Sequence, residues 1–146
     1  MIAVRVSPAP FDIGAAMAAL SSEGVGAVAS FTGIVRGDGG LIALTLEHYP
    51  AMTEAVLCVL ADEALARWSL GGVVLHHRVG RLVPGDHIVL VACASAHRKD
   101  ALEACTFLID RLKTDAPFWK RESFADGREQ WVEARVSDDA TAARWA

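Results

Sequence analysis

Segments that favour β-strands come mostly in pairs along this 146-residue chain, and segments with helical periodicity separate the pairs. Strands joined by a tight turn pair antiparallel, whereas parallel strands need a long crossover connection. The order β-α-β-β-α-β-β-α-β-β therefore predicts an α+β fold, with a mixed, largely antiparallel sheet and flanking helices. The length fits one domain over residues 1–146, and the sequence has no internal repeat or linker.

The β-type segments are recognised by apolar runs or alternation next to turn signals. They are residues 2–7, 26–36, 41–50, 73–82, 87–96, 118–124 and 129–136. Asp38-Gly39 lies between the second and third of these segments and is typical of a hairpin, so we expect those two strands to pair. Pro84-Gly85 predicts a second tight turn, between the fourth and fifth segments.

Apolar residues at helical spacing predict helices over residues 11–22, over residues 52–70 and from about residue 95 to residue 113. Gly71-Gly72 is expected to break the second helix. Ser95 precedes the third helix and is a candidate for its N-cap.

The formal net charge of -4 argues against a general attraction to nucleic acid or to an anionic membrane. The first residues lack the charged region and the continuous apolar run of a signal peptide. No apolar run reaches the roughly 18 residues that a membrane span needs. We therefore expect a cytoplasmic protein that meets anions only through a local basic cluster.

Cysteine and histidine give no sign of a redox or metal site. The three cysteines lie far apart in apolar contexts: Cys58, Cys93 and Cys105. We expect buried thiols there, with no disulfide framework, zinc cluster or CxxC pair. Three of the histidines follow no metal-binding spacing, and packing is the favoured role for them: His48, His76 and His77. The sequence thus predicts neither a metal nor a cofactor.

The stretch LKTDAPFWKRE places Lys113 at the end of the third predicted helix and Lys120 on the strand that follows. The simpler interpretation is that Lys113 complements a helix C-terminus and that Lys120 is a solvated strand residue. Phe118 and Trp119 favour a functional role, because aromatic side chains can exclude water from a pocket. Desolvation beside another cation lowers the pKa of a lysine and makes it usable as a nucleophile or a general acid/base.

Two further positions suit anions. Ser95, His97 and Arg98 lie where a strand passes into a helix, and backbone N–H groups with the helix dipole hold phosphate at such points. A capping and surface-charge role explains the same residues equally well. Arg36 ends a strand beside a Gly-rich turn and can grip phosphate or carboxylate, although Arg beside a turn is common.

Five motifs in this order resemble a known family: FTGIVR, LTLEHYPAMTE, HRVGRLVPGD, SAHR and LKTDAPFWKRE, followed by WVEAR and a terminal RW. Along essentially its whole length the chain resembles the large, catalytic subunit of molybdopterin synthase. The resemblance implies an α/β hammerhead fold and a homodimer, with a small subunit at each outer end to make a heterotetramer. The implied small partner is ubiquitin-like and carries a thiocarboxylate on a flexible C-terminal Gly-Gly tail.

The implied reaction transfers two sulfurs in succession to cyclic pyranopterin monophosphate and forms the dithiolene of molybdopterin. Because the sulfur arrives on the partner, the chain needs no catalytic thiol. The resemblance makes Lys113 and Lys120 catalytic, with Lys113 next to the terminal glycine of the partner for acid/base work or a transient link, and Lys120 beside the substrate. The implied substrate-binding residues are Arg36, His97, Arg98, Lys113, Lys120, Arg121 and Glu122.

The chain departs from the family pattern in one place, and two other functions are compared with the implied one. The turn after Arg36 is only GDGG, shorter than the loop expected in many members, and that loop can help to cover the substrate. A noncatalytic module that docks a ubiquitin-like tail would also explain the lysines. A small phosphate-ester enzyme acting alone is disfavoured, because the sequence shows neither a nucleophile motif nor a metal set.

Overall fold

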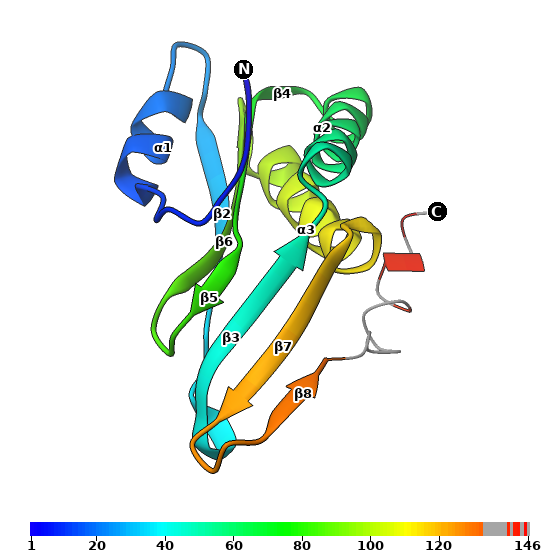
Figure 1. Cartoon of the computed structure of the whole chain (residues 1–146). Helices are drawn as coiled ribbons and strands as arrows, with labels where there is room; N and C mark the ends of the chain where they lie inside the picture. Colours follow the sequence, from blue (N-terminus) through cyan, green and yellow to red (C-terminus); the bar gives the residue numbers. More distant parts are fainter. Residues whose placement is uncertain (133–139, 141, 144, 146) are drawn as a thin grey trace.

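The computed structural model of the chain describes residues 1–132, 140, 142–143 and 145, which form two four-stranded sheets flanked by helices (Figure 1). The elements in chain order are β1 (Ile2–Ser7), α1 (Ile13–Leu20), β2 (Ala27–Ile34), the short 3-10 helix η1 (Asp38–Gly40), β3 (Leu41–His48), α2 (Pro50–Arg67), β4 (Leu70–Arg78), β5 (Gly80–Leu82), β6 (His87–Ser95), α3 (Arg98–Asp115), β7 (Phe118–Phe124) and β8 (Glu129–Trp131). The predicted strand over residues 129–136 is described only to residue 132, and its remainder, with part of the WVEAR and RW motifs, lies outside the described residues.

The predicted α+β fold is confirmed, and its strands are divided between two sheets. The first sheet has the order β1-β4-β6-β2, in which β1 and β4 are parallel and the other pairs are antiparallel. The second has the order β5-β3-β7-β8 and is antiparallel throughout. The mixed, largely antiparallel character expected from the sequence therefore holds for the strands taken together.

The predicted hairpin between residues 26–36 and 41–50 is wrong. β2 pairs with β6, whereas β3 pairs with β5 and β7 in the other sheet. Gly39 and Gly40 have positive φ angles of 64° and 81° and turn the chain through η1, not through a two-residue hairpin. The local turn signal was correct, but the partners of both strands were decided by long-range packing.

The predicted strand over residues 73–82 is also divided, because the chain changes sheets within it. β4 stays in the first sheet up to Arg78, and β5 joins the second sheet from Gly80. Gly80 has a φ of 83°, a conformation that side chains other than glycine rarely adopt. The two sheets are thus linked covalently within two residues.

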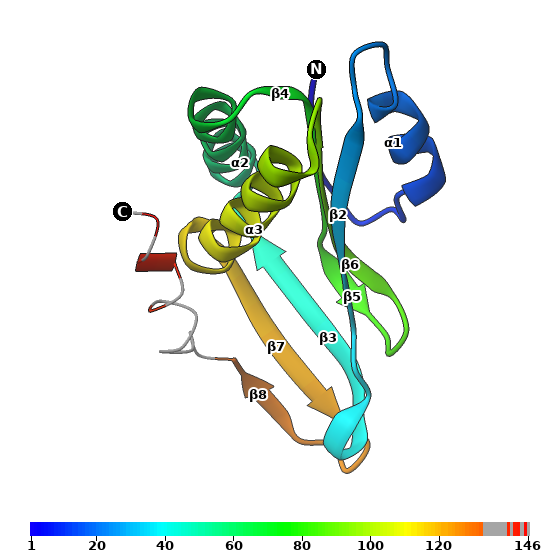
Figure 2. The same cartoon turned by 180° about the vertical axis from the view of Figure 1, so that it is seen from behind.

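Helices cover both faces of the first sheet. α2 and α3 pack on one face and α1 on the other (Figures 1 and 2). Alternate residues of the central strands point to opposite sides, so Val73 and Leu75 of β4 meet α2 and α3, whereas Val74 meets α1. Because β4 and β6 are covered on both faces, their sequences are almost continuous apolar runs.

The helix boundaries differ in detail from the predictions. The second helix is confirmed and ends at Arg67, but Gly71 and Gly72 lie inside β4 instead of in a helix-breaking turn. A Cβ atom at Gly72 would lie 2.7 Å from Leu20 Cδ2, so the glycine permits the close approach of α1. None of the helices in the described part of the chain is long and apolar enough to cross a membrane.

Two of the three cysteines are buried as predicted, and the prediction is wrong for the third. Cys93 and Cys105 lie in the core between α3 and the first sheet, where burial raises the pKa of the Cys105 thiol to about 11. Burial raises the pKa of Cys93 as well. Cys58 is exposed on α2, because its position on that helix points away from the sheet.

We expect Gly26→Ala to lower the free energy of unfolding by about 1–3 kcal/mol, the usual range for an overpacked site. A Cβ atom at Gly26 would lie 2.3 Å from the carbonyl oxygen of Ala96, so either the start of β2 or the β6–α3 connection must move. Urea denaturation measures the change. The control is Gly14→Ala in α1, where the nearest atom to the new Cβ is Asp12 Oδ1 at 3.5 Å, and stability should be unchanged or slightly higher. Wild-type stability in Gly26→Ala would contradict the close approach.

Candidate functional site

Lys113 and Lys120 lie on either side of the reversal between α3 and β7, as predicted. The helix ends where the N–H of Ala116 donates to the carbonyl of Leu112 at 3.4 Å, and the N–H of Phe118 then donates to the carbonyl of Ala116 at 2.9 Å. Lys113 is exposed in the last turn of α3, and Lys120 is half-buried in β7. A single tight turn therefore connects the two lysine-bearing elements.

Lys120 shares one face of β7 with Phe118, because alternate residues of a strand point the same way. In the register of the sheet Lys120 lies opposite Leu46, which is buried. Trp119 points to the other face, where its ring meets the edge of Tyr49 at 5.0 Å between centroids. Of the two aromatic residues expected to exclude water, Phe118 alone is therefore on the side of Lys120.

The ring of His77 stacks on Phe118, with 3.9 Å between centroids and 21° between planes. The Nδ1 atom of His77 is 2.7 Å from the carbonyl oxygen of Arg78; a carbonyl can only accept, so Nδ1 carries the proton and Nε2 the lone pair. Burial lowers the pKa of His77 to about 4; the bond to Arg78 opposes this shift, and the positive charges of Lys120 and His48 add to it. His77 is therefore neutral at pH 7.

Packing was the role favoured for His77 from the sequence, and the structure confirms it, but its stack on Phe118 of β7 was missed. The available signal is the alternation along VVLHHR. His77 continues the row of Val73 and Leu75, which face α2 and α3. His76 faces the other side of β4, where the centroid of its ring lies 6.1 Å from that of Phe11. The pattern thus separates the two adjacent histidines, although it does not reveal which strand meets them.

Arg121 and Glu122 point to opposite faces of β7, so the predicted shell around Lys120 is divided. The guanidinium of Arg121 lies over the ring of Trp131 at 5.7 Å, and its Nε is buried with no hydrogen-bond partner among the described residues. Glu122 shares the face of Lys120 and lies opposite Leu44 in β3. Glu122 is therefore the neighbour of Lys120 along the strand, and Arg121 is not.

Arg36 lies at the far end of the second sheet. It follows β2, and its Nε is 3.5 Å from a carboxylate oxygen of Asp38; both side chains are about three-quarters exposed, so this pair contributes little stability. A Cβ atom at the adjoining Gly37 would be 3.9 Å from the carbonyl oxygen of Leu41. Leu41 comes five residues before Leu46, the residue opposite Lys120 in the sheet. Five residues of strand correspond to about 17 Å, which is the separation along β3 between the Leu41 end and Lys120.

His97 and Arg98 lie at the N-terminus of α3. His97 is the N-cap residue and makes no side-chain capping bond, so the assignment of Ser95 as N-cap is wrong. Ser95 ends β6, and its hydroxyl instead donates to the carbonyl of Ser69 at 2.7 Å. Lys113 follows Arg98 by fifteen residues on one continuous helix, a separation of about 22 Å along its axis.

The residues predicted for one site therefore fall into three groups within a single chain. Lys113 lies in the last turn of α3, and Lys120, Arg121 and Glu122 follow on β7. Arg36 lies near the start of β3, and His97 with Arg98 lies at the other end of α3. Figures 1 and 2 show α3 passing from the end of β6 to the start of β7. A single turn connects the two elements that carry the lysines, whereas the two groups expected to bind phosphate lie at other places in the fold.

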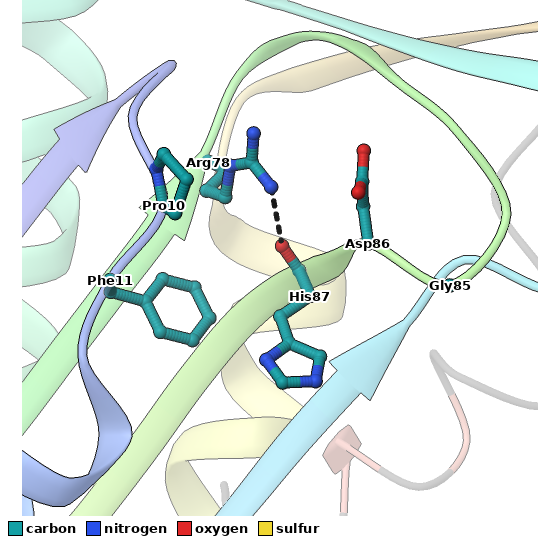
Figure 3. A pocket seen from close by; sticks show the side chains of 6 residues that line it. All are labelled: Pro10, Phe11, Arg78, Gly85, Asp86 and His87. Carbon is teal, nitrogen blue, oxygen red and sulfur yellow. Dashed lines mark hydrogen bonds between the residues drawn. The ribbon is translucent and has the colours of Figure 1, made fainter.

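A pocket of about 230 Å³ opens elsewhere, between the β1–α1 connection and the start of β6 (Figure 3). Its lining residues are Pro10, Phe11, Arg78, Gly85, Asp86 and His87. The guanidinium of Arg78 donates to the carbonyl of Pro8 at 3.1 and 3.2 Å and to that of His87 at 3.5 Å. Arg78 is thus engaged with backbone, and none of the predicted site residues lines this pocket.

Within the described ranges, no group of three or more His, Cys, Asp or Glu side chains is arranged to hold a metal ion. The basic side chains of the candidate site are instead those of lysine, arginine and histidine. Such a set suits anionic groups, namely carboxylates and phosphates.

The sequence model of the MoaE protein family matches residues 6–115. The chain is similar to the molybdopterin synthase catalytic subunit of Escherichia coli, with 52% identity over 97% of this chain and 97% of that protein. The solved molybdopterin biosynthesis MoaE protein of Burkholderia ambifaria has a TM-score of 0.85 and 49% identity, and the match covers 99% of this chain and 98% of that one.

A more distant likeness involves a complex. The complex of subunits 1 and 2 of molybdopterin-converting factor from Helicobacter pylori contains a chain with a TM-score of 0.74 and 24% identity. That match covers 92% of this chain and 91% of that chain, and at this identity it concerns the fold.

We expect His77→Phe to reduce the loss of stability in acid. The folded chain lowers the pKa of His77 to about 4, whereas the unfolded ring titrates near its ordinary 6.5, so the native state is fully stabilised above pH 6.5 and loses stability as the pH falls towards 4. The shift corresponds to about 3 kcal/mol. Urea denaturation between pH 7 and pH 4 should give a shallower slope for the variant, because Phe keeps the aromatic contact without the titration. Equal slopes would contradict the buried neutral state of His77.

Proposed function

The chain belongs to the MoaE family of molybdopterin synthase catalytic subunits, which are sulfurtransferases of molybdenum cofactor biosynthesis, and on that premise we propose its reaction. It takes sulfur from the C-terminal thiocarboxylate of a small ubiquitin-like partner. Two sulfurs pass in succession to cyclic pyranopterin monophosphate, whose cyclic phosphate opens as the dithiolene of molybdopterin forms. No cofactor takes part in this proposal.

The α3–β7 turn is the observation that carries the proposal. It offers one exposed ammonium, Lys113, and one half-buried ammonium, Lys120, on consecutive elements. A tail carboxylate and a phosphate are both anions, and a cation in a partly desolvated position interacts with them more strongly than one in bulk water. We assign Lys113 to the tail of the partner, as general acid/base or transient link, and Lys120 to charge balance as the phosphate ring opens.

The state of the thiols supports an external source of sulfur. Cys93 and Cys105 are buried in the core, and burial raises the pKa of both, which disfavours the thiolate that nucleophilic chemistry requires. Cys58 is exposed on α2, an element that contributes none of the predicted site residues. A partner that delivers sulfur on its own C-terminus explains why the site needs no thiol.

We propose that the small partner docks at each end of a homodimer of this chain to make a heterotetramer. The Helicobacter pylori complex pairs a chain of this fold with a second subunit, which supports a two-component enzyme. The tail of the partner is a flexible Gly-Gly segment, so it can reach the exposed Lys113 while the folded part of the partner binds elsewhere.

The homodimer also explains the separation of the predicted residues. Arg98 and Lys113 lie about 22 Å apart along one rigid helix, too far for both side chains to contact one small substrate from the same chain. We therefore propose that His97 and Arg98 of one protomer complete the anion pocket of the other. Arg36 and Arg121 keep the substrate-binding role proposed for them from the resemblance.

We expect Lys113→Ala to abolish turnover and Lys120→Ala to lower it by about 100-fold or more, the usual range for loss of a proton-transfer or charge-stabilising group. Both variants should stay folded, because Lys113 is exposed and Lys120 is only half-buried. Molybdopterin formation is followed in a mixture of purified chain, thiocarboxylated partner and cyclic pyranopterin monophosphate. The matched control is Lys99→Ala, which removes an exposed lysine that pairs with Glu103 at 3.4 Å.

The outcomes of that assay separate the candidate functions. Product from wild type and Lys99→Ala, but not from the other two variants, supports the reaction and the site. Full activity in Lys113→Ala would remove the central assignment. Tight binding of the partner by wild type without any product would identify a docking module, in which the lysines clamp a tail carboxylate.

The shared pocket predicts complementation between two inactive variants. A heterodimer of one Arg98→Ala and one Lys113→Ala protomer, isolated with two affinity tags, contains one site with both residues and one site with neither. We expect it to recover about half of the wild-type rate, since additivity holds for independent sites. Each homodimeric variant serves as the control. A heterodimer as inactive as both parents would mean that Arg98 and Lys113 do not act across protomers.

A further inference from the structure

We propose that Arg111 is a positioning residue for the proposed site: its guanidinium binds the carboxylates of Glu63 and Asp115 and offsets negative charge that would otherwise repel the tail of the partner. This inference rests on the role proposed above for Lys113, next to which that tail binds. It assigns a function to a charged cluster beside the α3–β7 turn that the reaction as described does not use.

Arg111 joins the end of α3 to the neighbouring helix. Its Nη1 lies 2.9 Å from Oε2 of Glu63 in α2, and its Nε lies 2.7 Å from Oδ2 of Asp115, the last residue of α3. The two helices pack side by side (Figures 1 and 2). The guanidinium also lies over the buried ring of Phe107 at 5.4 Å, and the side chain of Arg111 is only 22% exposed. Three contacts therefore fix this guanidinium, whose planar fork can serve two carboxylates at once.

Asp115 carries its charge where the helix itself disfavours it. The C-terminus of a helix has a partial negative charge, because its last carbonyl groups lack partners within the helix. Arg111 offsets this repulsion, and the hydroxyl of Thr114 donates to Oδ1 of Asp115 at 3.0 Å. Burial opposes the charge on Arg111, but the bonds to Asp115 and Glu63 outweigh burial and raise the pKa of Arg111. Arg111 therefore stays charged beside both acids.

The third acid near Lys113 is Asp110, which precedes it by three residues and so lies on the same side of α3. The indole Nε1 of Trp145 donates to Oδ2 of Asp110 at 2.6 Å. Lys113 is exposed, and within residues 1–132 it takes part in no ion pair. The carboxylates of this part of α3 are thus held by donors other than Lys113.

The charge of Asp115 acts on an anion at Lys113 without touching it. Residues two apart on a helix point to different sides, so the two charged groups lie about 10 Å apart. At that distance one unit charge changes a binding constant about 2- to 15-fold, depending on the effective dielectric constant. Loss of Arg111 leaves one more net negative charge at this end of α3. The tail carboxylate of the partner should then bind more weakly.

The test compares Arg111→Gln, which removes the positive charge, with the double variant Arg111→Gln/Asp115→Asn, which also removes one carboxylate and restores the net charge. The matched control is Arg128→Gln. Arg128 likewise pairs with an aspartate, Asp126 at 2.9 Å, and lies over an aromatic ring, that of Phe124 at 4.6 Å. The full chain is used throughout.

Calorimetry measures the Kd of each variant for the small partner in its carboxylate form, which binds without transferring sulfur. The titrations are made in about 0.05 M and about 0.5 M KCl, because salt at the higher concentration screens charges about 10 Å apart. A second partner, cut before its Gly-Gly tail, reports the binding that does not involve the tail. In addition, kcat and KM for molybdopterin formation are measured with the thiocarboxylated partner.

In Arg111→Gln we expect the Kd for the intact partner to rise about 3- to 10-fold at low salt and to stay within about twofold of wild type at high salt. The double variant should return to within about twofold of wild type at low salt, and Arg128→Gln should match wild type. KM should rise in step with Kd, whereas kcat should change by less than about twofold. The partner without its tail should bind wild type and all variants equally.

An unchanged Kd in Arg111→Gln would overturn the proposal. So would weaker binding that persists at high salt, that extends to the partner without its tail, or that Asp115→Asn does not recover, because each of these results indicates a purely structural role. If Arg111→Gln does not fold, Asp115→Asn alone decides: it should lower the Kd at low salt, and an unchanged Kd would count against the proposal.

The same experiment separates this inference from the proposed function. Wild-type chain that binds the partner but makes no molybdopterin would overturn the proposed reaction, and the comparison of Kd values would still decide the role of Arg111. Wild-type chain that does not bind the partner at all would overturn both.

Discussion

The passage of the chain from one sheet to the other between β4 and β5 is the constraint on which the rest of the structure depends. Arg78 ends the strand in the first sheet, and Gly80, with its positive φ, begins the strand in the second. This short link sets the distance between the sheets, so that a side chain of β4 meets a side chain of β7. The stack of His77 on Phe118 is the direct result.

Helix α3 acts as a spacer between two parts of the proposed chemistry. Its buried residues, among them Phe107 and Leu108, fix it on the first sheet, so its two ends have no freedom to approach each other. His97 and Arg98 at one end and Lys113 at the other therefore belong to different surfaces of the same chain. A site that uses both ends has to be assembled between molecules, which ties activity to oligomerisation in the function that we propose.

Local sequence patterns predicted the elements well and their partners less well. The three helices, the turn at Pro84-Gly85 and the position of both lysines agree with the structure, because each depends on a few neighbouring residues. The pairing of residues 26–36 with residues 41–50 was wrong, because β2 has a better partner in the apolar strand β6, 53 or more residues away in the chain. The exposed Cys58 was missed because an apolar sequence context does not reveal which side of α2 faces the sheet.

The amino-acid sequence by itself determined the fold class, the order of helices and strands, the two lysines around an aromatic turn, and the family. These properties reside in residue type, periodicity and short motifs, which act over a few positions of the chain. Only the tertiary structure decided that the strands form two sheets, that His77 stacks on Phe118, and that α3 separates His97 and Arg98 from Lys113. Those properties depend on which distant surfaces bury each other best, because burial of apolar area is shared among all the elements and no single segment encodes it.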